Sequence, residues 1–326
     1  MTARRQPQLE DIAKTGLADA AGRTYADFRS SLRPAWWVVA RDFVFGYLML
    51  AASAMLVVVA ADVYASLRAL WVVAGALLIG FWLAFIQLFL HEAAHFNFWP
   101  DRRWNDRLAD LLIGVWVATD IREYRRIHWD HHRFLGQPSD TERSYFSALG
   151  WRFLLESLFL VSAIRVIALR RGKLRDKPAG ATARDASGLV IAAAGALAHF
   201  LVLAICVWQE QMELALAWLA GNLMVYPLFG ALRQLLEHRD AAASAAVDYS
   251  IEPHGKLTRS FKAGPFGSFF GGAGFRWHDI HHFDPELSYT TLVRVDTFLQ
   301  GCDAAKAARS KRRSYWRVAL ELWRQR

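Results

Sequence analysis

The chain has 326 residues, with 39 Lys plus Arg against 30 Asp plus Glu, which gives a net charge of +9. Hydrophobic residues make up 54% of the sequence and charged residues only 21%, which excludes an intrinsically disordered chain. The two cysteines, Cys206 and Cys302, exclude a disulfide-rich scaffold and a four-cysteine zinc or iron–sulfur site. The basic charge suggests either nucleic-acid binding or a membrane protein with basic cytosolic segments, and composition does not separate the two.

Four apolar blocks follow one another along the chain, and each is long enough to cross a bilayer. They cover residues 43–61, 69–90, 188–208 and 214–232, and none of them contains Asp, Glu, Lys or Arg. The short links 62–68 and 209–213 join the blocks in pairs, so the sequence predicts two helical hairpins. Segment 149–169 is also apolar but carries Arg152, Glu156 and Arg165. We expect it to lie in the membrane interface as an amphipathic helix.

Lysine and arginine are distributed unevenly around these blocks. Residues 1–42 hold 7, residues 91–187 hold 16 and residues 237–326 hold 14, whereas the two hairpin links hold only Arg68. The positive-inside rule therefore places both termini and the middle segment in the cytosol. The predicted organisation is a cytosolic segment 1–42, a membrane domain 43–290 and a basic cytosolic tail 291–326. The net charge thus reports orientation in a membrane, and no nucleic-acid partner is expected.

Eight of the 11 histidines fall into three groups with helical spacing. Side chains at positions i, i+3 and i+4 share one face of a helix, so each group can direct its imidazoles into one site. All three groups lie in segments that the charge distribution assigns to the cytosol. The groups are His91 and His95; His128, His131 and His132; and His278, His281 and His282.

Neutral imidazole is a ligand for iron, zinc, copper and nickel. A single tetrahedral zinc takes at most four such ligands, so eight imidazoles match two metal ions with open positions better. His238, directly after the fourth apolar block, is a ninth candidate ligand. His199 and His254 stand alone, and we expect them to be ordinary core or surface histidines.

Two other functions fit part of this pattern. His91, Glu92 and His95 match the zinc-protease motif His-Glu-x-x-His, but that interpretation leaves the other two groups without a role. A membrane metal carrier would need polar groups along a path through the spans. Only His199 lies deep within a predicted span, which argues against a carrier.

With these groups the sequence resembles the membrane fatty acid desaturase and hydroxylase superfamily, over about residues 40–290. The three histidine boxes of that superfamily, one His-x-x-x-His and two His-x-x-His-His, correspond to the three groups given above. A stretch ending at Asp140 follows the second box, and Pro285 follows the third. The resemblance implies an all-α integral membrane fold, with four transmembrane helices in two hairpins and a cytosolic helical cap that carries the boxes.

The resemblance also implies two non-haem irons, held by the eight box histidines and His238, and dioxygen as co-substrate. The implied reaction removes hydrogen from an acyl chain, and a fatty acid or acyl-lipid desaturase is the leading hypothesis. A hydroxylase or ketolase acting on a lipid, alkane or carotenoid stays open, because the boxes do not separate these enzymes. The polar residues next to the ligands are candidates to orient their rings from outside the metal site. They are Glu92, Asp130, Gln234, Glu237 and Asp279.

Several partners follow from this assignment. A lipid or acyl-carrier substrate would enter from the bilayer side. The arginines and lysines around 122–133 and 170–177 could bind its anionic head group or simply attract anionic lipid. The sequence shows no cysteine cluster and no dinucleotide fingerprint. Electrons must therefore come from a separate ferredoxin, rubredoxin or b-type cytochrome with its reductase. The composition, rich in alanine and arginine, suggests a bacterial inner membrane.

Overall fold

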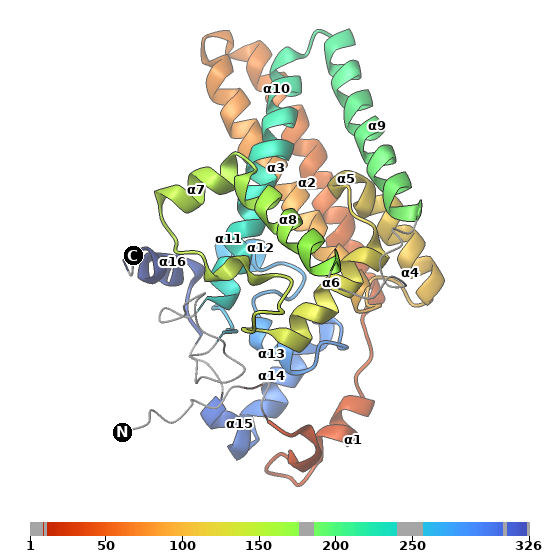
Figure 1. Ribbon diagram of the computed structural model, residues 1–326, viewed down its shortest axis with the longest axis vertical. Coiled ribbons are helices and arrows are strands. Elements are labelled where there is room, and N and C mark those ends of the chain that lie inside the picture. Colours follow the sequence, from red (N-terminus) through yellow and green to blue (C-terminus); the bar gives the residue numbers. More distant parts are fainter. Residues whose placement is uncertain (1–8, 10–11, 176–185, 240–256, 309–311, 325–326) are drawn as a thin grey trace.

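The structure is a computed structural model that describes residues 9, 12–175, 186–239, 257–308 and 312–324. Within these residues the regular elements are helices, and the β-structure consists of isolated bridges. Long apolar helices form a bundle at one end of the molecule, and shorter helices form a cap at the other (Figure 1). The all-α architecture predicted from the sequence is therefore confirmed.

Four helical segments are long and apolar enough to cross a membrane, and they contain the four predicted blocks. Helices α2 (Trp36–Val63) and α3 (Arg68–Ala94) form the first hairpin. Helix α9 (Ala186–Trp208) and the segment α10 (Met212–Ala220), η6 (Gly221–Val225) and α11 (Tyr226–His238) form the second. The helices continue past the apolar blocks into polar residues. His91 and His238 therefore lie at helix ends that reach the cap.

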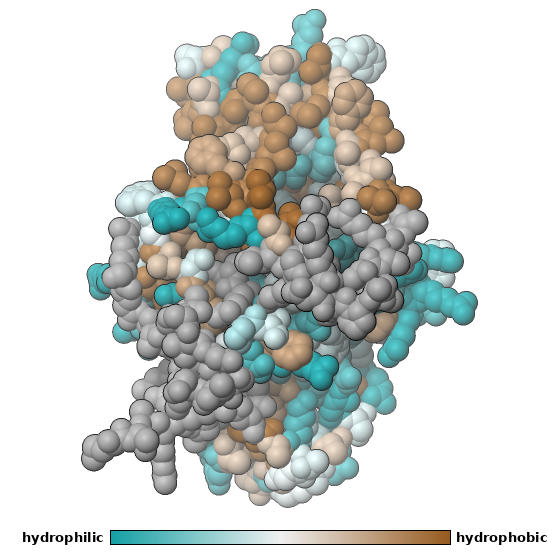
Figure 2. All heavy atoms as spheres, in the orientation of Figure 1, coloured by the Kyte–Doolittle hydropathy of each residue, from teal (hydrophilic) through white to brown (hydrophobic). Residues whose placement is uncertain are grey.

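The two hairpins turn at the same end of the bundle, at the top of Figure 1. Nε of Arg68, in the link of the first hairpin, lies 3.3 Å from Oε1 of Glu213, in the link of the second hairpin. Side chains such as Leu48, Val190 and Phe200 are more than half exposed on the spans. Figure 2 shows apolar side chains covering this part of the surface, as expected of a surface that lipid covers.

Helix α3 packs closely against the second hairpin. A Cβ atom at Gly80 would lie 2.5 Å from Cβ of Val225 and 2.7 Å from the carbonyl oxygen of Gly221. The absence of a side chain at Gly80 therefore allows the two backbones to approach, as small residues do between membrane helices. The η6 segment at this contact is a π-helical turn, and Pro227 follows it at the start of α11. Such turns shift the following helix relative to the preceding one.

The apolar segment 149–169 is not a candidate span, as expected, but it forms two helices rather than one. They are α7 (Trp151–Leu158) and α8 (Val161–Arg175). The helical conformation is interrupted between them at Leu160, whose φ is +63°. Trp151 and Ile164 are strongly exposed. A second set of short elements, which also does not span, consists of α4 (Arg102–Ala109), η4 (Asp110–Gly114) and α5 (Val115–Val117).

The cap is built from segments that are distant in sequence. Asp284, directly after α13, accepts hydrogen bonds from the Tyr25 hydroxyl (2.8 Å) and from Nε of Arg29 (2.7 Å). Phe28 stacks on Phe298 with ring centroids 4.4 Å apart. Residues before 42 and after 291 thus share one core beneath α13. The cap helices are α1 (Tyr25–Ser30), α6 (Ile121–Phe134), α12 (Pro265–Phe270), α13 (His278–Phe283), α14 (Leu292–Gln300), α15 (Asp303–Ala308) and α16 (Tyr315–Arg324), with short 3₁₀ turns at Lys14–Gly16, Ala65–Leu67, Arg143–Phe146 and Tyr289–Thr291.

Candidate metal centre

The first histidine box lies where α3 ends. His91 is in the last turn of α3, and His95 follows its last residue. Arg125 of α6 donates from Nε to the carbonyl oxygen of Ala94 (2.9 Å) and from Nη2 to that of Ala93 (3.0 Å). The last carbonyls of a helix lack the usual i+4 amide partners, and a cation suits the negative end of a helix dipole. Arg125 therefore fixes the end of α3 against α6, which carries the second box.

The second box lies in the C-terminal half of α6. Asp120 begins this helix by accepting hydrogen bonds from the backbone amides of Arg122 (2.9 Å) and Glu123 (3.0 Å). His128 and His131 are fully buried on its inner face, and His132 is half-buried beside them. The i, i+3, i+4 spacing thus places the three imidazoles together, as predicted.

The third box occupies α13, a helix of only six residues. A helix of that length is unstable in isolation and depends on tertiary contacts. Ser260 donates a hydrogen bond to Asp279 within α13, and Asp284 anchors its end as described above. His278, His281 and His282 are all buried.

All nine predicted ligands converge at the junction of α3, α6, α11 and α13. Five of them form one group whose ligand atoms lie within 4.8 Å of one another, and three form a second group. His278 adjoins the second group, because its Nε2 lies 2.8 Å from Nε2 of His238. The rings of His132 and His282, one from each group, have centroids 4.3 Å apart. The first group is His91, His95, His128, His132 and His281; the second is His131, His238 and His282.

The arrangement of these nitrogens fits metal ions. Nε2 of His132 lies 3.0 Å from Nε2 of His128 and 3.1 Å from Nε2 of His281. Two nitrogens bound at right angles to one ion, each at about 2.1 Å, are about 3.0 Å apart. Both ring nitrogens of His91 and of His95 are buried, and they have no hydrogen-bond partner among the described residues. Buried polar atoms without a partner are costly, and coordination to a metal would satisfy them.

Burial keeps these imidazoles in the form that binds metal. Removal from water, and then repulsion between neighbouring imidazoles, lower the pKa of His132, His278 and His282 well below the ordinary value of 6.5. The pKa of His281 is lowered in the same way. The rings are therefore neutral at pH 7, and a metal need not displace protons to bind them.

Asp140 orients one of the ligands, and the sequence analysis did not select it for this role. Its Oδ1 lies 3.0 Å from Nδ1 of His131, and both side chains are fully buried. The Tyr145 hydroxyl donates to the other carboxylate oxygen. A hydrogen bond from Nδ1–H of His131 to Asp140 puts the lone pair on Nε2, which lies 3.2 Å from Nε2 of His238 within the second group. The only sequence signal was the position of Asp140 at the end of the stretch that follows the second box.

Two of the five polar residues expected to orient the rings, Glu92 and Gln234, have contacts that lead to a histidine. Oε1 of Glu92 is 3.5 Å from Nδ1 of His91, while its Oε2 accepts the backbone N–H of Tyr289. Gln234 donates from Nε2 to Oε2 of Glu142 (3.0 Å), and Oε1 of Glu142 lies 3.8 Å from Nδ1 of His128. Gln234 therefore reaches the site through Glu142, a residue that the sequence analysis did not select.

The other three polar candidates remain predictions. Glu237 accepts a hydrogen bond from the Tyr315 hydroxyl (3.1 Å) and lies 3.8 Å from Nε of Arg233. Asp279 accepts from Ser260, as described above. Asp130 is half-buried on α6.

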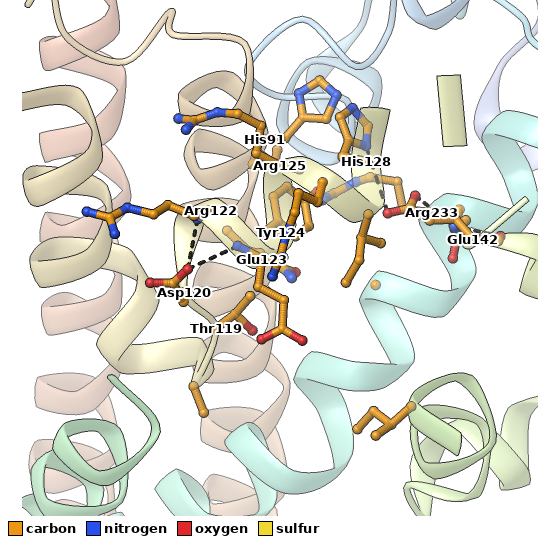
Figure 3. A pocket seen from close by; sticks show the side chains of 18 of the residues that line it. His91, Thr119, Asp120, Arg122, Glu123, Tyr124, Arg125, His128, Glu142 and Arg233 are labelled. Atoms are coloured by element: carbon orange, nitrogen blue, oxygen red, sulfur yellow. Dashed lines mark hydrogen bonds and ion pairs between the residues drawn. The ribbon is translucent and has the colours of Figure 1, made fainter. Parts of the chain in front are cut away.

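A cavity of about 1030 Å³ leads to the histidines. His91 and His128 lie on one side of its lining, and Thr119 and Glu123 lie on the other (Figure 3). Apolar residues of α8 and α9, among them Ile167 and Leu189, line another part of the wall, and α11 contributes Gly230 and polar side chains. The cavity therefore connects the side of α6 and the neighbouring apolar helices with the metal-binding nitrogens.

Of the two isolated histidines, the structure describes only His199. His199 accepts a hydrogen bond from Nε1 of Trp218 (3.1 Å), and its Nε2 lies 3.1 Å from the carbonyl oxygen of Trp116. It is a hydrogen-bonded residue within a span, as expected. His254 lies outside the described residues.

His91 and His95 share their group with histidines from two other elements, which the zinc-protease interpretation does not account for.

Comparison with known proteins agrees with this site. The family model described as fatty acid desaturase matches residues 68–313, which is most of the chain and includes all three boxes. A search of curated proteins finds no match. The match also extends beyond residue 290, where the resemblance found in the sequence ends, into part of the predicted tail 291–326. The chain belongs to the fatty acid desaturase family.

Proposed function

We propose that this desaturase uses dioxygen and two non-haem irons to remove hydrogen from the hydrocarbon chain of a lipid, and that it introduces a C=C bond. The observation that carries the proposal is the convergence of nine histidines into two adjacent groups at the inner end of a cavity. Neutral nitrogen ligands retain iron through changes of oxidation state and leave coordination positions open. Bound iron would supply the activation of dioxygen.

The residues of the chain hold and orient the reacting groups. His91, His128, His238 and His278 line the cavity, so a chain bound there lies next to both histidine groups. The apolar residues of α8 and α9 in the wall suit a hydrocarbon. Asp140 fixes the tautomer of His131, and Arg125 fixes the end of α3 that carries the first box.

The balance of the reaction requires an external reductant. Desaturation converts –CH₂–CH₂–, dioxygen, two electrons and two protons into –CH=CH– and two waters. We propose that a ferredoxin, rubredoxin or b-type cytochrome supplies the electrons. We also propose that both termini and the cap face the cytosol, in a bacterial inner membrane, because lysine and arginine are concentrated there.

The decisive experiment is lipid profiling of cells with and without the gene under ¹⁸O-labelled dioxygen. A product two hydrogens lighter and without label indicates desaturation, whereas label in the product indicates the hydroxylase or ketolase alternative. Unchanged lipids would contradict both. Purified protein should contain about two irons per chain, and one zinc per chain would overturn the di-iron assignment.

A ligand variant tests the site itself. We expect His131→Ala to abolish turnover and to lower the iron content, because His131 is fully buried between Asp140 and His238. His199→Gln is the matched control, since His199 lies outside both groups and should leave the iron content unchanged.

A further inference from the structure

The solvent-facing side of α6 has an unusual composition. Its exposed residues are Arg122, Arg126, Trp129 and Arg133, at positions i, i+4, i+7 and i+11, so they form one stripe along the helix. We call these four residues the α6 stripe. The opposite side of the same helix carries His128 and His131. The helix thus presents three positive charges and one indole to solvent, directly outside the metal centre.

Trp129 connects this surface to the histidines. Its ring centroid lies 5.0 Å from that of His95 and 5.8 Å from that of His132, and both belong to the five-histidine group. The side chain nevertheless remains 36% exposed. One edge of the indole therefore contacts metal-binding imidazoles, while another is open to a partner.

We propose that the α6 stripe is the docking surface for a small acidic one-electron carrier protein, with Trp129 at the contact nearest to the metal centre. The proposal rests on the proposed function, in which each turnover consumes two electrons and two protons. The carrier is oxidised by one electron at each of two encounters, and these electrons, with two from the substrate C–H bonds, reduce dioxygen to two waters.

The composition of the stripe favours a protein partner over the membrane surface. Arginine and tryptophan are enriched at the centres of protein interfaces, and positive patches steer acidic partners. Arg122 and Arg126, near the start of α6, also line the cavity and could serve a lipid head group. Trp129 and Arg133 lie farther along α6, which runs away from the spans toward α13 (Figure 1). A small carrier can dock on an area of this size, since redox encounters bury less than about 1,200 Å².

Binding of a defined probe tests the surface. The iron-loaded full chain is placed in phosphatidylcholine nanodiscs, and the Kd of an acidic [2Fe–2S] ferredoxin is measured at increasing NaCl concentrations. We expect Arg133→Glu to raise Kd about tenfold at low salt, and the difference to shrink as salt screens the charges. Arg317→Glu, a charge reversal at an exposed position on α16, is the matched control and should change Kd less than about twofold. Equal effects of the two variants would overturn the proposal.

Electron transfer tests the role of Trp129. We expect Trp129→Leu to slow the oxidation of reduced ferredoxin at least about tenfold in stopped-flow measurements at saturating ferredoxin, with unchanged iron content, and Trp129→Phe to retain most of the rate. Turnover of Arg133→Glu with dithionite as reductant should equal that of the wild type, because this route bypasses docking. A wild-type rate in Trp129→Leu would contradict the proposal.

Two further outcomes separate the possible failures. If Arg133→Glu weakens binding to phosphatidylglycerol vesicles but not to ferredoxin, the stripe is a lipid-binding surface and the proposal is wrong. If ferredoxin binding responds as expected but no lipid is oxidised, the docking surface stands and the proposed function fails. If both stripe variants oxidise lipid at the wild-type rate with ferredoxin as the electron donor, the proposed function stands and the proposed docking surface is wrong.

Discussion

Asp140 is a buried carboxylate hydrogen-bonded to His131, one of the predicted metal ligands. When Asp140 accepts a hydrogen bond from Nδ1–H of His131, the lone pair that could bind metal is on Nε2. An asparagine at this position can donate an N–H to Nδ1, which favours the tautomer with the proton on Nε2. We therefore expect Asp140→Asn to lower iron affinity about 10–100-fold, measured by competition with a chelator.

The control for this variant is a buried aspartate away from the histidines. Asp296 is 3% exposed and pairs with Arg312. Asp296→Asn should lower stability without a change in iron affinity. Equal iron affinity in Asp140→Asn and the wild type would show that Asp140 does not control the tautomer.

Sequence reasoning predicted the histidines that converge but not the carboxylate that is hydrogen-bonded to His131, for a geometrical reason. Helical periodicity brings residues three and four apart to one face, so the boxes were predictable. A residue directly adjacent to a ligand is rotated by about 100° around the helix. Accordingly, Glu237, next to His238, contacts Tyr315 and Arg233. Asp140 comes from a loop beyond α6, whose path no periodicity specifies.

At the scale of elements, α11 forms one wall of the cavity and carries Gly230 there. A Cβ atom at this position would have no neighbour within 4 Å. Glycine within a helix costs about 1 kcal/mol relative to alanine, so its presence requires a reason. Free space for the proposed hydrocarbon substrate would be such a reason.

Substitution at Gly230 tests this interpretation of the cavity. We expect Gly230→Ala to raise the Tm slightly and retain turnover, and Gly230→Trp to reduce turnover about tenfold or more with unchanged iron content, because the indole would fill the cavity. Leu219→Trp is the control, since Leu219 lies in the same span and is 43% exposed. Wild-type turnover in Gly230→Trp would show that the substrate does not pass this wall.

The spans were predictable as elements because length and hydropathy suffice to identify them. The break between α7 and α8 could not be predicted. Residues 158–161 are all apolar, and Leu160 adopts a positive φ at a position where no glycine indicates it. The π-helical turn before Pro227 could not be predicted from the sequence either, because it depends on packing against α3 at Gly80.

At the scale of the molecule, the two hairpins place the link 209–213 and the cap at opposite ends of the bundle (Figure 1). With Cys206 and Cys302 replaced by serine, we expect Gln209→Cys to react with a membrane-impermeant maleimide in intact cells. Asp303→Cys, on α15 of the cap, should react only after permeabilisation. The reverse pattern would overturn the proposed orientation.

The sequence could not predict that both ends of the chain pack beneath the third box. Tyr25 and Arg29 reach Asp284 across more than 250 residues, and Phe28 stacks on Phe298. Neither contact leaves a local pattern. Charge counts assigned these segments to the cytosol but gave no information about what they contact there.

Because the boxes lie far apart in sequence, bound metal should link the parts of the cap and stabilise the whole fold. We expect removal of iron with a chelator to lower the Tm measured by intrinsic tryptophan fluorescence. The metal-free protein should lose further stability as the pH falls below about 6.5, because burial lowers the pKa of His132, His278, His281 and His282 in the folded state. The unfolded chain then binds more protons than the folded chain, so acid favours unfolding. Added Fe(II) at pH 7.5 should restore the Tm, whereas added Mg²⁺, which prefers oxygen ligands, should not. A Tm that is independent of iron would contradict a structural link through the metals.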